Sequence, residues 1–164
     1  MTAVELLIEV IAEQAPENIW GTSPLAGYRL LGNTNRGEIG EEFVRRYLIS
    51  SGIEATKGGR TARTDMLIAN HRFEVKTASQ GANGTFQFNH VRLDRKYEHL
   101  LCLGICPLEI VFNVWRKGDV AEGRAGTLVR MAEGQAVTYK ITKKLKEMMP
   151  IDDLPTTLRT NLNI

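Results

Sequence analysis

Apolar residues recur at helical spacing in two stretches near the start of the chain. Between residues 4 and 13 they alternate with glutamates, which predicts an amphipathic N-terminal helix. Prolines and glycines then break the pattern, so a connecting arm is expected up to about residue 35. A second helix is expected from Asn35 or Arg36 to about Ser51, where Gly52 ends it.

Shorter apolar runs in the remaining sequence predict strands separated by turns. The expected strands are residues 53–56, 65–69, 73–77, 100–105 and 110–115, followed by a hairpin of 127–131 with 136–141. Residues 86–91 are short and ambiguous, residues 94–99 suit a helical turn, and residues 142–149 suit a basic helix. These elements predict an α/β or α+β domain in which helices flank a central mixed sheet.

Length and composition fit one globular domain. With 164 residues, of which 43% are apolar, the chain can bury a single core of reasonable size. Residues 1–35 are expected to form the N-terminal helix and arm, 36–149 the catalytic core, and 150–164 a C-terminal tail. The N-terminus lacks a basic segment followed by an unbroken apolar run, and the longest apolar run is too short to cross a bilayer. A cytoplasmic protein without membrane contact is therefore expected.

Charge is distributed unevenly along the chain, although the formal net charge is only +2. Acidic residues gather at 38–42, and basic residues dominate 57–63, 92–96 and 140–146. Proteins that bind nucleic acids concentrate positive charge on one face, which a near-neutral total can conceal. For any single basic residue, a solvated surface position is the ordinary alternative. As clusters, the candidates for contacts with DNA phosphates are Lys57, Arg60, Arg63, Arg92, Arg95 and Lys96.

A short hairpin carries the most informative chemistry. The chain is expected to reverse near Asn70, which brings Leu67 opposite Glu74. Asp65 then lies opposite Lys76. Because side chains alternate between the two faces of a strand, Asp65, Glu74 and Lys76 share one face. The other face is wholly apolar, which supports this assignment, and consists of Met66, Ile68, Phe73 and Val75.

Two carboxylates on one face can converge on a single cation, because diagonal neighbours in such a pair lie about 7–8 Å apart at their Cα atoms. Oxygen-only ligands suit Mg²⁺, with Mn²⁺ as a substitute ion, and such an ion promotes phosphodiester hydrolysis. Lys76 beside the ion would position or deprotonate the attacking water, or stabilise the transition state. Taken alone, a Glu-x-Lys pair is more often the wet face of an amphipathic hairpin, so the motif needs support from its context.

Three stretches together resemble the PD-(D/E)XK nucleases, the superfamily that contains most type II restriction endonucleases and the archaeal Holliday-junction resolvases. They are residues 37–44, 64–68 and 73–78, with a weaker continuation into 86–89 and 100–105. The resemblance implies a restriction-endonuclease-like core in the order helix, three strands, helix and strand (αβββαβ). One departure is Thr64, which stands where the family motif has proline, a change that the family tolerates widely.

The resemblance also implies roles for individual residues. Asp65 matches the first metal-ligating acid of the family, Glu74 the second, and Lys76 the catalytic lysine. The implied metal is Mg²⁺, and the implied substrate is double-stranded DNA.

An acidic residue on the preceding helix often completes the metal site in such families. Glu41 matches this position best, through the Gly-Glu-x-x-Val spacing of residues 40–44. Glu38 lies three residues earlier on the same side of the helix. Glu42 is less favoured, because it points about 100° away from Glu41.

Two further groups of residues have more than one explanation. Gln87 and Asn89 carry amides that can read adenine edges, or that orient the lysine or a water. Cys102 and Cys106 lack a fourth ligand with suitable spacing for zinc. Buried structural cysteines are therefore expected.

The leading hypothesis is a type II restriction-type endonuclease that cuts double-stranded DNA with Mg²⁺. Symmetric cutting of both strands usually needs two active sites, so a homodimer is expected, with the N-terminal helix and arm as a dimer or DNA-clamping element. A structure-specific or repair nuclease of the resolvase kind is the alternative within the enzyme class. A non-catalytic DNA-binding module on the same fold is the alternative outside it, and the intact Asp65, Glu74 and Lys76 set argues against that module.

Overall fold

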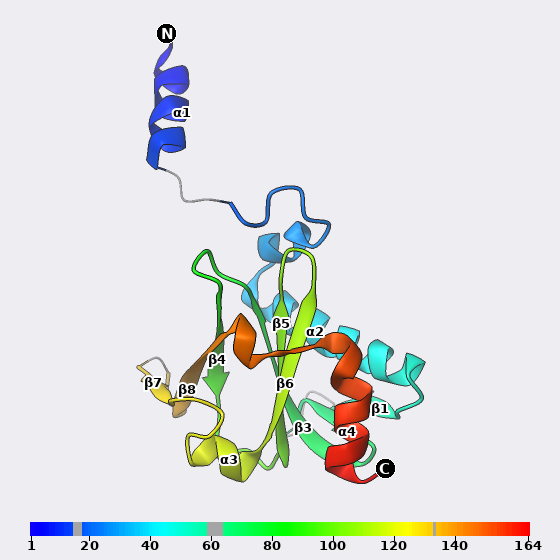
Figure 1. Ribbon diagram of the computed structural model, residues 1–164. Coiled ribbons are helices and arrows are strands. Elements are labelled where there is room, and N and C mark those ends of the chain that lie inside the picture. Colours follow the sequence, from blue (N-terminus) through cyan, green and yellow to red (C-terminus); the bar gives the residue numbers. More distant parts are fainter. Residues whose placement is uncertain (15–17, 59–63, 133) are drawn as a thin grey trace.

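A six-stranded mixed sheet forms the centre of the protein (Figure 1). The computed structural model describes residues 1–14, 18–58, 64–132 and 134–164. β3 and β5 pair in parallel, and the other neighbouring strands of this sheet are antiparallel. In sheet order the strands are β1 (Ala55–Lys57), β2 (Met66–Ile68), β3 (His71–Ser79), β5 (His99–Ile105), β6 (Ile110–Arg116) and β9 (Met149–Pro150). The expected mixed sheet with flanking helices is confirmed.

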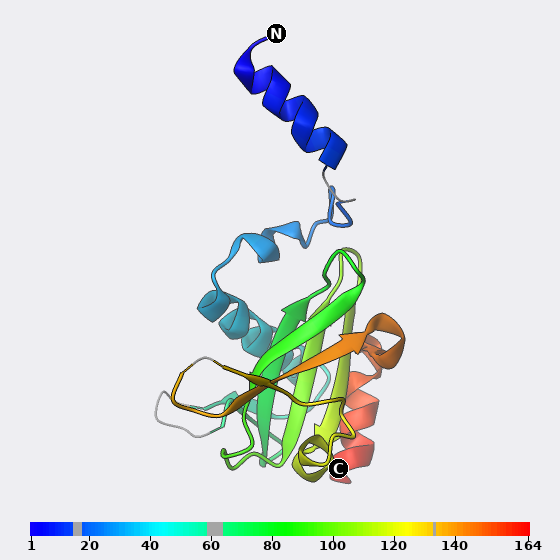
Figure 2. The same cartoon turned by 90° about the vertical axis from the view of Figure 1, so that its left-hand side faces the viewer.

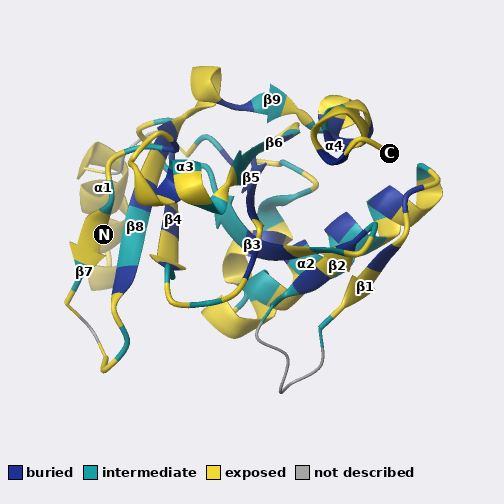
Figure 3. Cartoon of the chain, turned by 90° about the horizontal axis from the view of Figure 1, so that it is seen from below, coloured by how far each residue is buried: buried dark blue, intermediate teal, exposed yellow. Residues whose placement is uncertain are grey.

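A second, three-stranded antiparallel sheet covers one face of the central sheet, as Figures 2 and 3 show. It has the order β4 (Thr85–Val91), β8 (Thr138–Lys144) and β7 (Val129–Met131). The helices α2 (Asn33–Ser50) and α4 (Leu154–Leu162) lie on the other face (Figure 3), and α3 (Lys117–Ala121) follows β6. The central sheet is therefore the middle of three layers.

Each face of the central sheet packs on its own apolar cluster. On the helical side, Phe73 and Val75 of β3 pack with Val44 and Leu48 of α2, whose spacing of four residues places them on one helix face. On the other side, Phe86 and Phe88 of β4 pack with Leu100 and Cys102 of β5, among others. Because both faces are covered, all seven residues of β5 are buried. The two cysteines are buried and free, as expected of packing residues.

The hairpin of β2 and β3 reverses over two residues, Ala69 and Asn70. Both have positive φ, at 47° and 67°, which is typical of the turns that match the twist of paired strands. The turn lies one residue earlier than the sequence predicts, so the expected pairing is wrong. Leu67 lies opposite Arg72, not Glu74.

The N-terminal helix α1 (Ala3–Gln14) is confirmed and lies apart from the three layers (Figures 1 and 2). No residue of α1 is buried. The segment that includes the 3₁₀ helix η1 (Ala26–Leu30) is held to the body, because Trp20 and Tyr28 pack with Ile105. The Trp20 indole N–H also donates to the Gln80 carbonyl at 3.1 Å. Among the described residues, no helix has the length and apolar character needed to cross a membrane.

Three expectations for secondary structure are wrong. The resemblance implies a helix between the third and fourth strands, yet residues 80–98 are all described and contain β4 but no helix. The helical turn expected at residues 94–99 is therefore absent as well. Residues 142–149 form the end of β8, η2 (Leu145–Glu147) and the start of β9 instead of a basic helix. The physical reason is that Lys143 points inward, where its ammonium donates to the Ala125 carbonyl at 2.8 Å.

The C-terminal residues also differ from the expected tail. They form η3 (Ile151–Asp153) and α4, whose Leu154, Leu158 and Leu162 are buried in the helical-side cluster. These leucines recur every fourth residue and so share one helix face. Burying each stabilises the fold by about 1.5–3 kcal/mol, which makes this segment part of the core.

Candidate active site

The hairpin brings Asp65 beside Glu74. Met66 lies opposite Phe73, so the next position of the ladder places Asp65 across from Glu74. The Asp65 carboxylate also accepts a hydrogen bond from the Val75 backbone N–H at 3.0 Å. The observed register differs from the predicted one by two residues, and an even shift leaves every side chain on its predicted face.

Glu74 is a buried carboxylate with incomplete pairing. Its side chain is 2% exposed, and Oε1 lies 3.7 Å from Lys76 Nζ and 3.8 Å from Arg95 Nη1. Its Oε2 is buried and has no hydrogen-bond partner among the residues that the structure describes. Burial is the main cause that raises the pKa of Glu74, and the Asp65 charge adds to it, while Lys76 and Arg95 oppose them. Lys76 and Arg95 therefore lie near one oxygen of this carboxylate and leave the other oxygen unpaired.

Of the three acidic candidates on α2, the structure brings Glu41 to the site. Burial, and then the nearby Asp65 charge, raise the pKa of Glu41 to about 7. Glu42 points elsewhere, because its carboxylate binds Arg45, Arg46 and Lys57. Those hydrogen bonds hold the pKa of Glu42 well below its usual range.

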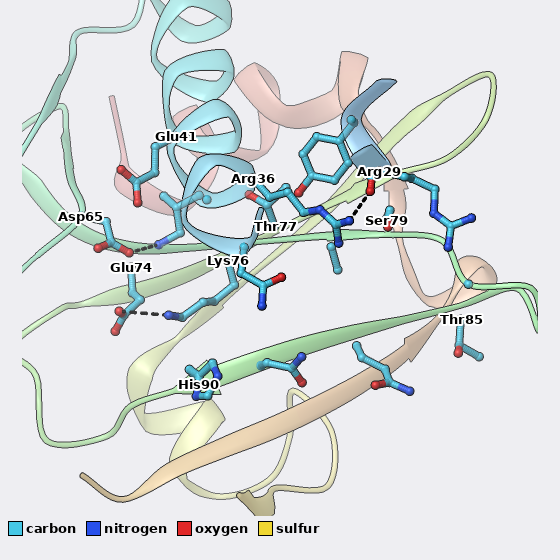
Figure 4. A pocket seen from close by; sticks show the side chains of 18 of the residues that line it. Arg29, Arg36, Glu41, Asp65, Glu74, Lys76, Thr77, Ser79, Thr85 and His90 are labelled. Carbon is cyan, nitrogen blue, oxygen red and sulfur yellow. Dashed lines mark hydrogen bonds and ion pairs between the residues drawn. The ribbon is translucent and has the colours of Figure 1, made fainter. Parts of the chain in front are cut away.

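These groups line one cavity of about 470 Å³ between the start of α2, β3 and β4 (Figure 4). Glu41, Asp65 and Glu74 lie at one end of it, with Lys76 beside them (Figure 4). Strand β4 forms the opposite wall and contributes Thr85, Gln87, Asn89 and His90.

A distortion of β4 shapes that wall. Phe86 and Phe88 point into the core, so the alternation of the strand turns Gln87 and Asn89 outward. The register with β8 then shifts between Phe88 and Val91, and His90 has a φ of 57°. A bulge of this kind re-aims side chains, and here both Asn89 and His90 line the cavity.

The donor set of the cavity fits a hard divalent cation. Two carboxylates, those of Asp65 and Glu74, lie across one strand pair, and a Glu74 oxygen is unpaired. Among the described residues, no group of three or more His, Cys, Asp or Glu side chains is close enough to hold a metal ion. Mg²⁺ suits such a site, because it commonly binds one or two carboxylates and takes its other ligands from water and phosphate oxygens.

No family model matches this chain, and no curated protein matches it either. A solved structure does. It is that of a bacterial homing endonuclease, I-Ssp6803I, with a TM-score of 0.46 and 13% sequence identity. The similarity covers 70% of this chain and 77% of that one.

The residues predicted to contact DNA fall into three groups. Gln87, Asn89 and Arg95 line the cavity. Three others do not line it: Lys57 pairs with Glu42, Arg92 pairs with Asp94, and Lys96 is exposed. Arg60 and Arg63 lie outside the described residues.

Part of the cavity wall is formed by residues that the sequence did not predict to lie there. Arg29 and Arg36 line the cavity at a distance from Asp65 and Glu74 (Figure 4). Tyr28 also lines the cavity, and His90 contributes to the wall that β4 forms. The prolines and glycines around Tyr28 predict a connecting arm, and they carry no information about where that arm packs. The apolar and aromatic residues of the arm, such as Trp20 and Leu25, were the available indication that the arm packs on the body.

Proposed function

We propose that this chain is a Mg²⁺-dependent endodeoxyribonuclease that hydrolyses phosphodiester bonds in double-stranded DNA. The observation that carries the proposal is the cavity in which Asp65 and Glu74 share an end with Lys76, while a buried Glu74 oxygen lacks a partner. A site with two adjacent acids and one amine has little use in binding phosphate without a cation, because the acids repel it. With a cation, the same groups favour attack on phosphorus.

Asp65 and Glu74 would hold the Mg²⁺ ion, and Glu41 is placed to assist them through a water. When bound, the ion polarises the scissile phosphate and activates water for attack. The hydrogen bond from the Val75 N–H fixes one oxygen of Asp65, which leaves the other free for the ion. Arg95 offsets part of the Glu74 charge and opposes the rise in the pKa of that buried carboxylate.

Lys76 supplies the positive charge of the site. Its side chain is 22% exposed and its ammonium lies 3.7 Å from Glu74, so it can reach a phosphate oxygen without leaving the acids. The ammonium would orient the attacking water and stabilise negative charge that develops on the phosphate oxygens. Gln87 and Asn89 of β4 face the same space and would contact the bound DNA.

Plasmid digestion tests the proposal. With Mg²⁺ the protein is expected to cut plasmid DNA, with chelator it is expected to cut none, and Asp65→Asn is expected to lower the rate by about 10³-fold. Asp119→Asn is the matched control, because Asp119 lies in α3 and pairs with Arg124, outside the cavity. Cleavage that persists in chelator or in Asp65→Asn contradicts the proposal.

The cleavage products distinguish a restriction endonuclease from a structure-specific nuclease. We propose a type II restriction endonuclease, for which intact plasmid yields discrete fragments. Selective cutting of branched or flapped DNA, with intact duplex left uncut, identifies a structure-specific nuclease of the resolvase kind instead. DNA binding that survives chelator, with no cleavage under Mg²⁺ or Mn²⁺, identifies a non-catalytic binding module.

We further propose that two copies pair through α1. Glu5, Glu9 and Glu13 are four residues apart and form one stripe, and the remaining residues of α1 apart from Gln14 are apolar. Its exposed apolar side chains include Leu7 (58%) and Ile8 (60%). Apolar surface of this extent on an isolated helix is stabilised by burial. A second copy suits this role because cutting two strands takes two sites.

The body offers a matching surface for α1 of that second copy. An apolar hollow of about 270 Å³ lies between the arm and α2, and its walls include Leu25, Leu31, Ile39, Phe43, Leu103 and Ile110. We expect wild type to sediment as a dimer and Ile8→Asp to sediment as a monomer. Leu108→Asp is the control, because Leu108 is 83% exposed but lies outside α1 and the hollow. A monomeric wild type contradicts this pairing.

A further inference from the structure

The cavity has a second end, built by the arm and by the start of α2. Tyr28, Arg29 and Arg36 line it together with Asn33 and Gly37. Figure 4 shows Arg36 and Arg29 progressively farther along the cavity from Asp65 and Glu74. We infer that this arm end is an anion-binding subsite for a second phosphate of the nucleic-acid strand, an inference that rests on the proposed function.

Two buried hydrogen-bond donors of the arm end have no partner. Tyr28 is only 9% exposed, and within the described ranges its hydroxyl forms no hydrogen bond and the buried Arg36 Nε is unpaired as well. A buried polar group without a partner costs about 1–3 kcal/mol, so native proteins seldom leave one unless a ligand completes it. Arg36 Nε can only donate, and the Tyr28 hydroxyl can donate to the same acceptor. The group that satisfies both is therefore an acceptor.

The positive charge at the arm end favours a negatively charged acceptor over a neutral one. Neither Arg29 nor Arg36 forms a salt bridge within the described part of the chain. Each guanidinium is held in place by an aromatic ring, with Arg36 Cζ 5.7 Å from the Tyr28 ring and Arg29 Cζ 5.5 Å from the Trp20 ring. Arg36 also donates through Nη2 to the Arg29 carbonyl. These contacts fix the two positive charges beside the cavity before any ligand arrives.

The first turn of α2 adds to this positive field. This helix has 18 residues, and its N-cap is Gly32, which has no side chain to accept from the first N–H groups. Asn33 and Gly37 of this turn region line the cavity. An uncapped helix N-terminus favours anions through its free N–H groups and the helix dipole. The helix dipole, the arginines and the unpaired hydroxyl thus favour the same class of ligand.

A phosphodiester matches this subsite better than a neutral group, and the proposed DNA substrate supplies it. Its oxygens accept several hydrogen bonds at once and pair with the planar guanidinium in a forked geometry. The arm end and the acidic end belong to one cavity, so a strand whose scissile phosphate lies by Lys76 places a neighbouring phosphate by Arg36. The arm end therefore sets the position of the strand and neutralises a phosphate that is not cut.

DNA binding as a function of salt tests the subsite. Binding of a labelled duplex is measured by fluorescence anisotropy from about 50 to about 200 mM salt with Mg²⁺, in an Asp65→Asn background that suppresses cleavage. Arg36→Met is expected to weaken binding about tenfold at low salt and to lower the slope of log K against log salt by about 0.9, the value for one phosphate contact. Tyr28→Phe is expected to weaken binding about fivefold with an unchanged slope, because the hydroxyl carries no charge.

The matched control is Arg46→Met. Arg46 lies in the same helix, its side chain is 76% exposed, and it pairs with Glu42 outside the cavity. Equal salt slopes for Arg36→Met and Arg46→Met overturn the subsite even if wild type cuts DNA. Loss at Arg36 and Tyr28 in a protein that binds but never cuts DNA supports the subsite while the nuclease proposal fails. A wild-type chain that binds no duplex overturns both.

Discussion

Lys76→Met is expected to abolish most DNA cleavage, with a loss of about 10³-fold in the single-turnover rate. Methionine keeps much of the length of the lysine stem but has no charge to place against the phosphate. The loss falls on the rate and much less on the affinity for DNA, because the arm end and β4 still contact the strand. Rates measured at saturating protein, with thermal melting to confirm folding, check this expectation.

The same substitution has a second effect on Glu74. Removing the ammonium takes away a positive charge that lowers the pKa of this buried carboxylate, so the pKa of Glu74 rises further. Lys76→Arg separates the two effects: it keeps the positive charge that lowers the pKa of Glu74 but places a bulkier planar group at the site, so cleavage is still lost. Lys146→Met is the control, because Lys146 is exposed and lies outside the cavity. A Lys76→Met rate within tenfold of wild type contradicts the role of Lys76.

The sequence was sufficient to place the acidic end of the cavity because strand periodicity is insensitive to small errors in register. The predicted pairing was off by two residues, yet Asp65 and Glu74 still fell on one face, because faces repeat every second residue. Glu41 was favoured over Glu42 by its match to the Gly-Glu-x-x-Val spacing of the family that the sequence resembles, and the structure places Glu41 in the cavity. In each case a local sequence pattern decided the outcome.

Features set by packing between distant segments were not predictable in the same way. β4 follows a short turn and pairs with β8, about fifty residues later in the chain, so no local pattern shows that Gln87 faces the cavity. Arg36 was placed in the second helix, but its role at the cavity depends on Tyr28 of the arm. Lys143 appeared as a surface charge by its type, whereas the Ala125 carbonyl makes its burial possible.

Gly40→Ala is expected to destabilise the fold by about 1–3 kcal/mol, although alanine is the better helix former. Gly40 is the point where α2 crosses β3, and a Cβ there would lie 2.8 Å from Thr77 Cβ and 2.9 Å from Thr77 Cγ2. These atoms belong to a short side chain on a central strand, so they cannot move away without shifting the strand. Relief requires that α2 separate from β3, which lowers the melting temperature by about 2–10 °C for a chain of this size.

Separation of α2 also moves Glu41, the residue after Gly40, away from Asp65. We therefore expect Gly40→Ala to reduce cleavage even at temperatures where the variant is fully folded. Gly37→Ala is the matched control for stability alone: it lies in the same helix, one turn earlier, and a Cβ there has nothing within 4 Å. It is expected to raise stability by about 0.5–1 kcal/mol. If both substitutions raise the melting temperature, the close approach of α2 to β3 is not what positions Glu41.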